Sequence, residues 1–291
     1  MPEKARYNEP LRDLAPEAYR LSQFLCGPCR DLHGLWPYIR LSRASTGFEA
    51  PESRLQDELR ILFDRGSRRL LIAGAQDTGL LSLMVRSSAG HNVEITVLDI
   101  CETPLELCRG LAKQWSLSIA TIRQDLFDFR VERQFDIVLM HGTLHFIAAD
   151  RRLEVLRRIR HALHPTGRLI VLFNTSHPVS TDLDRQNGDD YASTVLSELK
   201  KLAVPLPESE AVMRERLTAH RKSRGASISQ WAERIALDRE FTKRTQFGGD
   251  SRPTLNRTNC AQYLAELASR NRDEDPLCRR GQIEDHHGYL A

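Results

Sequence analysis

Five short apolar segments alternate with helical segments in the middle of this 291-residue chain, and this alternation constrains the fold more than any other feature. Runs rich in leucine, isoleucine and valine predict strands, and the longer amphipathic intervals predict helices. We expect strands at residues 69–73, 93–98, 118–122, 135–140 and 168–173, and helices at residues 80–87, 104–115 and 150–163. Strands that alternate with helices form a parallel sheet covered on both faces. The predicted core is a three-layer α/β/α domain with a mostly parallel sheet.

The first predicted strand runs into a turn of small residues. Right-handed crossovers bring the carboxyl ends of parallel strands to one edge of the sheet, where ligands bind. A small-residue turn at that edge lets a cofactor approach the backbone and the N–H groups at the start of the next helix. The residues that we expect to contact a cofactor here are Ala73, Gly74, Ala75, Gln76 and Gly79.

The next strands end on residues suited to bind a nucleoside. Asp99 comes 25 positions after the first glycine of the turn. It can accept hydrogen bonds from both hydroxyls of a ribose, with Ile100 beside it. Asp125 follows the third strand, where its carboxylate can accept a hydrogen bond from the adenine amine while Leu126 packs against the ring. His141 ends the fourth strand, near the expected position of the cofactor's reactive end.

The glycine turn distinguishes two classes of nucleoside cofactor. Gly74 and Gly79 keep the outer spacing of the dinucleotide fingerprint, but Gln76 occupies its middle position. The middle glycine of that fingerprint allows the backbone to approach a pyrophosphate. S-adenosylmethionine carries no phosphate and makes a smaller demand. The turn therefore favours the methyl donor over a dinucleotide.

Five segments occur in the order and spacing of one enzyme family: RLLIAGAQDTGLL, ITVLDICETPLELCR, IRQDLFDF, FDIVLMHGTLHFI and RRIRHALHPTGRLIVLF. On these segments, residues 69–175 resemble the class I, Rossmann-like S-adenosylmethionine-dependent methyltransferases. The resemblance implies S-adenosylmethionine as cofactor, S-adenosylhomocysteine as product, and about seven strands that end in an antiparallel hairpin, here within residues 242–290. Ile72 stands where the family usually has an acid, and Asp77 is the nearby acid that could replace it.

Three histidines are candidates for acid–base catalysis. His141 and His145 follow the fourth strand, and His177 follows the fifth. A histidine can deprotonate a hydroxyl or amine acceptor near neutral pH. Because methyl transfer depends mainly on alignment, a free amine would need no base, and the choice between O- and N-methylation stays open.

The polar flanks of the core predict helical additions. We divide the chain into an N-terminal helical cap at residues 1–66, the cofactor-binding core at residues 67–175, and residues 176–291, which supply a helical insertion and complete the sheet. Helices at 11–25, 53–63 and 193–239 are expected to cover the acceptor pocket, and Pro16, Pro28, Pro37 and Pro51 to break the N-terminal helices. Aromatic candidates for the pocket lining are Tyr7, Trp36, Tyr38, Tyr191 and Trp231.

The tetrapeptide Cys26-Gly27-Pro28-Cys29 has the sequence of a thioredoxin-like redox site. That chemistry requires a helix start directly after a core strand, whereas residues 11–25 read as a helix. Zinc bound by Cys26, Cys29 and His33 would lack an evident fourth ligand. We therefore predict no metal site, and free thiols for all six cysteines.

Charge and hydropathy limit the partners. The formal net charge is +3, from 42 basic and 39 acidic residues, which is too balanced to indicate nucleic acid. No apolar run is long enough for a membrane span, and the N-terminus lacks the apolar region of a secretory signal. We expect a cytoplasmic enzyme that methylates a small molecule, as in secondary-metabolite (natural-product) biosynthesis; a homodimer is compatible with these features.

Two rival functions remain open on the sequence. An RNA or protein methyltransferase would need the arginine-rich stretches 151–161 or 214–224 beside the cofactor. A non-catalytic scaffold would keep the fold but lose cofactor affinity.

Overall fold

The computed structural model describes residues 3–42, 49–148, 151–172 and 188–222. In chain order, its helices and strands are α1 (Glu3–Leu25), α2 (Arg30–Leu41), α3 (Glu49–Asp64), β1 (Arg69–Ala73), α4 (Gly79–Ser87), β2 (Glu94–Asp99), α5 (Glu102–Gln114), β3 (Ile119–Arg123), β4 (Phe135–His141), the 3₁₀ helix η1 (Thr143–Phe146), α6 (Arg152–Ala162), β5 (Leu163–Leu172) and α8 (Gly188–Lys201). Residues 210–222 are also helical.

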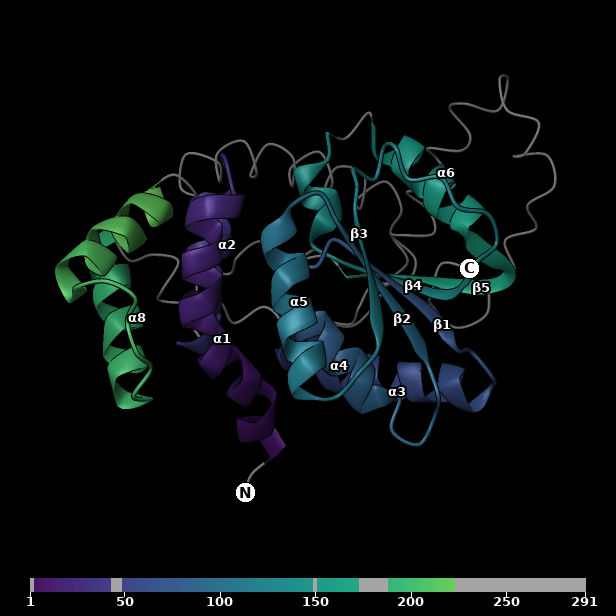
Figure 1. Ribbon diagram of the computed structural model, residues 1–291, viewed down its shortest axis with the longest axis horizontal. Coiled ribbons are helices and arrows are strands. Elements are labelled where there is room, and N and C mark those ends of the chain that lie inside the picture. The colour runs from purple at the N-terminus through teal and green to yellow at the C-terminus, as the bar shows by residue number, and fades with distance from the viewer. Residues whose placement is uncertain (1–2, 43–48, 149–150, 173–187, 223–291) are drawn as a thin grey trace, which may run out of the picture.

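The five described strands form one sheet in the order β3-β2-β1-β4-β5, and every described pair is parallel. The chain moves outward from β1 to β3 and then returns beside β1 as β4, so the topological switch point lies between β1 and β4 (Figure 1). This confirms the predicted Rossmann-like α/β class. The two further strands expected within residues 242–290 lie outside the described residues.

Alternate side chains of the strands supply two separate apolar layers. Leu70 and Ile72 of β1 face the layer that contains α3, α4 and α5, whereas Leu71 and Ala73 face the layer that contains α6. Period-two alternation in a strand produces this division. The central strands β1 and β4 contribute apolar side chains to both layers, which explains why they read as near-continuous hydrophobic runs.

The start of β5 differs from the sequence-based prediction. The sequence predicts that this strand begins at residue 168, but it begins at Leu163, which pairs with Phe135. The pairing register shifts between Phe135 and Ile137, so the segment with Pro165 and Gly167 is accommodated as an irregularity in the ladder.

The N-terminal helices contain more prolines than expected. Only Pro28 separates two helices, whereas Pro16, Pro37 and Pro51 lie inside α1, α2 and α3. Pro51 falls in a first turn, where the missing N–H costs nothing. Pro37 is buried in α2, between Leu35 and Tyr38, so tertiary packing offsets the lost hydrogen bond.

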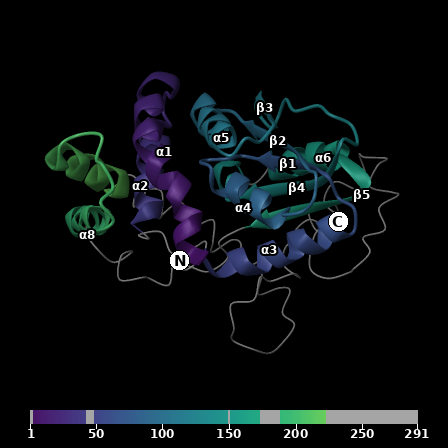
Figure 2. The ribbon, with the colours of Figure 1, turned by 60° about the horizontal axis from the view of Figure 1, so that its bottom comes forward.

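Helices α1 and α2 lie between the sheet and the helices of the later segment. Helix α1 places Leu14 and Ala18 in the layer under the sheet, and its Leu11 and Tyr19 in a second cluster with α2, α8 and residues 204–217. Figures 1 and 2 both show α1 and α2 standing between α8 and α5. Helix α3, expected to belong to the cap, instead packs Leu59 and Phe63 against the sheet layer. No helix among the described residues has the length and apolarity of a membrane span.

Candidate cofactor-binding site

The turn between β1 and α4 depends on Gly74 and comes very close to η1. Gly74 has φ of +86°, a left-handed conformation that L side chains rarely adopt. A Cβ at this position would collide with the side chain of Thr143, whose hydroxyl donates to the Ala73 carbonyl at 2.9 Å. The hydroxyl of η1 thus fixes the end of β1, and only glycine fits the space that remains.

The next part of the turn also has an unusual backbone conformation. Gln76 has φ of +50°, so it also adopts the left-handed conformation. Ala75 is buried and Gln76 is half-buried, which leaves Gln76 on the outer side of the turn. The cofactor contacts predicted for this turn stay predictions.

Asp99 connects the β1 turn to the end of β2. One oxygen of its carboxylate accepts a hydrogen bond from the Ala75 N–H at 2.9 Å, and the other accepts from the Cys101 N–H at 2.8 Å. Its side chain is half-buried. A carboxylate can accept about four hydrogen bonds, so a lone pair remains on each oxygen for a diol. The two backbone donors fix the orientation of the carboxylate at the end of β2.

The end of β3 lies next to the same edge. The Gln124 N–H donates to the Asp99 carbonyl at 3.0 Å, and the Asp125 carboxylate accepts from the Phe127 N–H at 2.9 Å. Leu126 is half-buried against the α6 layer. Ile100, directly after β2, is a large apolar side chain that is 63% exposed. Such a surface can cover the face of a purine.

Asp77, the acid considered as a replacement at Ile72, is already engaged. Its carboxylate forms a salt bridge with Arg40 of α2, with an N–O distance of 2.7 Å, and accepts from the Gly79 N–H at 2.6 Å. Asp77 is 3% exposed. The Asp77 carboxylate therefore caps the start of α4 and neutralises the guanidinium of Arg40, so its negative charge stabilises the fold.

The catalytic candidates have different outcomes. His141 is the last residue of β4, pairs with Leu172 of β5, and is half-buried at the carboxyl edge of the sheet. His145 lies in η1, but its side chain is outside the described residues, as is the whole of His177. The structure thus brings His141 to the cofactor edge and leaves the roles of all three as predictions.

Three residues in contact with this site were not predicted from the sequence. Arg40 reaches Asp77 across 37 positions, Thr143 reaches Ala73 across 70, and Cys101 contacts Cys26 across 75. None of these contacts can be recognised from a local pattern in the sequence. In the sequence, only the CGPC tetrapeptide at residues 26–29 indicated that the N-terminal helices have a role besides packing.

Comparison with known families matches residues 75–167 to a family described as a methyltransferase domain. This segment begins one residue after Gly74 and ends at Gly167, so it includes the ends of β2, β3 and β4. It covers about the same segment as the five motifs.

The relatives found by sequence share one name. A carboxy-S-adenosyl-L-methionine synthase of Pseudomonas aeruginosa is 38% identical over 107 residues, which are 33% of this chain and 42% of that protein. A protein of the same name from Pseudomonas paraeruginosa is 26% identical over 249 residues, 79% of this chain and 95% of that protein. The chain thus spans less than half of the first relative and nearly all of the second.

Solved structures with a similar fold include two S-adenosylmethionine-dependent methyltransferases. The one from Mesorhizobium loti has a TM-score of 0.33 and 20% identity, and the match covers 40% of this chain and 51% of the other. The one from Clostridium acetobutylicum has a TM-score of 0.38 and 15% identity, covering 46% and 53%.

Proposed function

We propose, on the premise that this chain carries a class I, Rossmann-like S-adenosylmethionine-dependent methyltransferase domain, that it transfers the methyl group of this cofactor to a small-molecule acceptor. The observation that carries the proposal is the environment of Asp99. Its two backbone donors hold the carboxylate at the end of β2, beside a turn where only glycine fits at residue 74.

The residues at this edge match the parts of the cofactor. Asp99 would accept hydrogen bonds from the ribose hydroxyls, Asp125 would accept one from the adenine amine, and Ile100 would pack on the purine. Gly74 and Ala75 offer backbone to the amino-acid portion. These roles are supported by the positions of the residues on adjacent strands β1, β2 and β3.

Methyl transfer requires little of the protein beyond the alignment of the acceptor with the methyl group. When bound, S-adenosylmethionine supplies an electrophilic methyl group on a sulfonium. The protein's residues orient the nucleoside, exclude water and direct the acceptor toward that methyl group. His141, at the end of β4 beside the switch point, would accept the proton of a hydroxyl acceptor. We therefore favour a hydroxyl or amine of a metabolite as the acceptor.

The arginine-rich stretches support a small acceptor over RNA. Arg152 donates to the Ile147 carbonyl, Arg158 pairs with Glu154, and Arg214 pairs with Glu210. Arg216 reaches Asp31 of α2. Arginines that pair within the protein are less available to phosphates, which favours a small acceptor over a nucleic acid.

A second candidate is synthesis of a carboxylated S-adenosylmethionine. It is favoured by the relative of that name, because the match covers 95% of that protein. In this case the same cofactor site would hold the nucleoside as a substrate whose methyl carbon is modified, instead of a donor that loses the methyl group.

Mass spectrometry of the nucleosides separates the two candidates. The purified protein is incubated with S-adenosylmethionine that carries an isotope-labelled methyl group, together with panels of small hydroxyl, amine and carboxylic-acid compounds. A methyltransferase forms S-adenosylhomocysteine and passes the label to one acceptor. The second function keeps the label on a nucleoside heavier by one carboxyl group. If neither product forms and neither nucleoside binds, the chain is a scaffold and the proposed function is wrong.

A further inference from the structure

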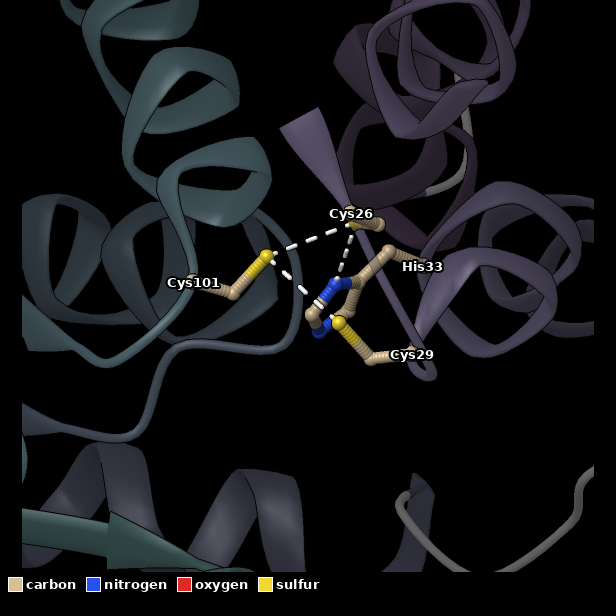
Figure 3. A group of neighbouring side chains, drawn as sticks. All are labelled: Cys26, Cys29, His33 and Cys101. Atoms are coloured by element: carbon tan, nitrogen blue, oxygen red, sulfur yellow. Dashed lines mark hydrogen bonds between the residues drawn. The ribbon is translucent and has the colours of Figure 1, made fainter. Parts of the chain in front are cut away.

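Three cysteines and one histidine converge at the corner between α1 and α2. Cys26 and Cys29 belong to that corner, His33 lies in the first turn of α2, and Cys101 follows β2 at the start of α5. Figure 3 shows the side chains of the N-terminal helices and the sulfur of Cys101 pointing toward one another. Their ligand atoms all lie within 4.8 Å of one another. The fourth group that the sequence did not supply is therefore Cys101.

Three of the separations between these ligand atoms are close to the edges of a tetrahedral zinc site, and all of them are within 4.8 Å. The Sγ of Cys26 is 3.4 Å from the Sγ of Cys101 and 3.3 Å from the Nδ1 of His33, and the sulfurs of Cys29 and Cys101 are 3.7 Å apart. With Zn–S bonds of about 2.3 Å and a Zn–N bond of about 2.05 Å, tetrahedral geometry places two sulfurs about 3.8 Å apart and a sulfur and a nitrogen about 3.6 Å apart. Each of the three separations falls within about 0.4 Å of these values.

The chemistry of the set also points to zinc. Cysteine and histidine are its preferred ligands, and Cys26 and Cys29 have the C-x₂-C spacing that recurs in zinc sites. His33 and Cys101 are buried, whereas Cys26 and Cys29 are half-buried. The hydroxyl of Thr103, which is fully buried, lies 3.0 Å from the Sγ of Cys26 and can donate to it. A donor of this kind stabilises a thiolate ligand from outside the metal shell.

A redox pair accounts for less of this arrangement. A disulfide between Cys26 and Cys29 would use two of the four groups and would leave the convergence of His33 and Cys101 unexplained. Cys26 also follows the helix α1 instead of a core strand, so the surroundings differ from those of a thioredoxin-like site.

We propose that Cys26, Cys29, His33 and Cys101 bind one Zn²⁺ ion as a closed, structural Cys₃His site. All four positions are taken by protein ligands, so no position is open for a substrate or an activated water. Binding releases the protons of the cysteine thiols, and His33 coordinates as a neutral imidazole. The site binds the helical hairpin α1–α2 to the loop that leads from the sheet into α5.

The position of this loop connects the metal to the cofactor edge. The N–H of Cys101 donates to Asp99, which also holds the Ala75 N–H of the β1 turn. Zinc would therefore fix the backbone on one side of the carboxylate that binds ribose. This consequence rests on the proposed function, whereas the metal site itself does not.

Metal analysis of the full-length protein tests the proposal. Protein purified under reducing conditions is expected to contain about one zinc ion per chain by elemental mass spectrometry. Cys29→Ser and Cys101→Ser should each lower that content at least about fivefold, because each removes a thiolate ligand. Cys108→Ala is the matched control, since Cys108 is a buried free cysteine of α5 outside the cluster, and it should keep its zinc.

Cobalt substitution gives a readout that does not depend on the variants folding. Co²⁺ added to metal-depleted wild-type protein should produce the visible absorption of tetrahedral, thiolate-bound cobalt, and Zn²⁺ should displace it. The proposal is overturned if the reduced wild-type protein neither contains nor takes up zinc, or if the two serine variants retain it. Cofactor titration of the same samples keeps this result separate from the proposed function.

Discussion

At the scale of single residues, the site is defined by what the backbone requires. Gly74 is needed because its φ is positive and because Thr143 occupies the space next to it. Asp99 is needed because it accepts from two backbone N–H groups on different loops. The glycine and the acid were both predicted from the sequence, since each stands directly at a strand end. Thr143 was not, because its contact with β1 joins segments 70 positions apart.

Gly74→Ala tests the close approach of the turn to η1. Gly90 also has φ of +86°, but a Cβ placed on it would meet nothing within 4 Å, so Gly90→Ala is a matched control for backbone strain alone. We expect Gly90→Ala to lower the free energy of unfolding by about 1 kcal/mol and Gly74→Ala by about 2 kcal/mol or more, because the second adds a steric clash. Urea unfolding measures both.

The variant Thr143→Ala completes that comparison. In its background, Gly74→Ala should be less destabilising, because the colliding side chain has been shortened. Equal costs for the two glycine substitutions would contradict the role assigned to Thr143.

At the scale of elements, the sheet agreed with its prediction to within one or two residues at most strand ends. Buried parallel strands are dense in branched apolar residues, so their signal is local. The sequence predicted helical structure in this region but a break at Pro37, whereas α2 continues through Pro37 to Leu41. Its buried side chains Leu35, Tyr38 and Ile39 show that tertiary packing stabilises it.

The contact between β4 and the start of β1 predicts a dependence of stability on pH. The carboxylate of Asp136 accepts from the N–H groups of Arg68 and Arg69, both at 2.9 Å, and pairs with the Arg69 guanidinium at 3.0 Å. Burial alone would raise the pKa of Asp136, but the bonds from Arg69 and the two N–H groups outweigh it, so the pKa is lowered. The carboxylate therefore stabilises the fold above its unfolded pKa of about 3.9, and this contribution disappears as the pH falls below that value.

Asp136→Asn checks this assignment by acid unfolding followed with circular dichroism. The variant should be less stable at neutral pH and should lose less stability than wild type between about pH 4 and pH 2. Asp57 forms an exposed pair with Arg60, so Asp57→Asn should change neither the stability at neutral pH nor the loss of stability in acid. A steep acid transition that persists in Asp136→Asn would show that another group is responsible.

At the scale of the whole molecule, the N-terminal hairpin is joined to the core by contacts that no local pattern reveals. Arg40 of α2 pairs with Asp77 at the start of α4, and the cysteines of the α1–α2 corner meet Cys101. The sequence identified the CGPC motif and the acid but not their partners, since proximity in space is set by the fold. The predicted hairpin of the last two strands and His177 lie outside the described residues, so they remain predictions.

Arg40→Met tests the buried link between the hairpin and the core. The side chains of Arg40 and Asp77 are 12% and 4% exposed, so removing the arginine leaves a buried carboxylate without its main cation. We expect a loss of about 3 kcal/mol in the free energy of unfolding by urea titration.

A second substitution and a control show whether the unbalanced charge causes the loss of stability in Arg40→Met. Asp77→Asn combined with Arg40→Met should recover part of it, because the unbalanced charge is removed. Arg20→Ala breaks an exposed pair with Glu17 and should cost no more than about 0.5 kcal/mol. Similar costs for Arg40→Met and Arg20→Ala would contradict a buried structural ion pair.

Calorimetric titration with S-adenosylhomocysteine is the most direct test of the cofactor site. We expect the wild-type protein to bind it with a Kd on the order of micromolar. Asp99→Ala should weaken the affinity at least about tenfold, because hydrogen bonds to a charged group contribute about 1.5–3 kcal/mol. Asp128→Ala, which removes an exposed acid in the neighbouring loop after β3, should bind like wild type. Absence of binding by the folded wild-type protein, or equal affinity in wild type and Asp99→Ala, would contradict the assignment of this edge as the cofactor site.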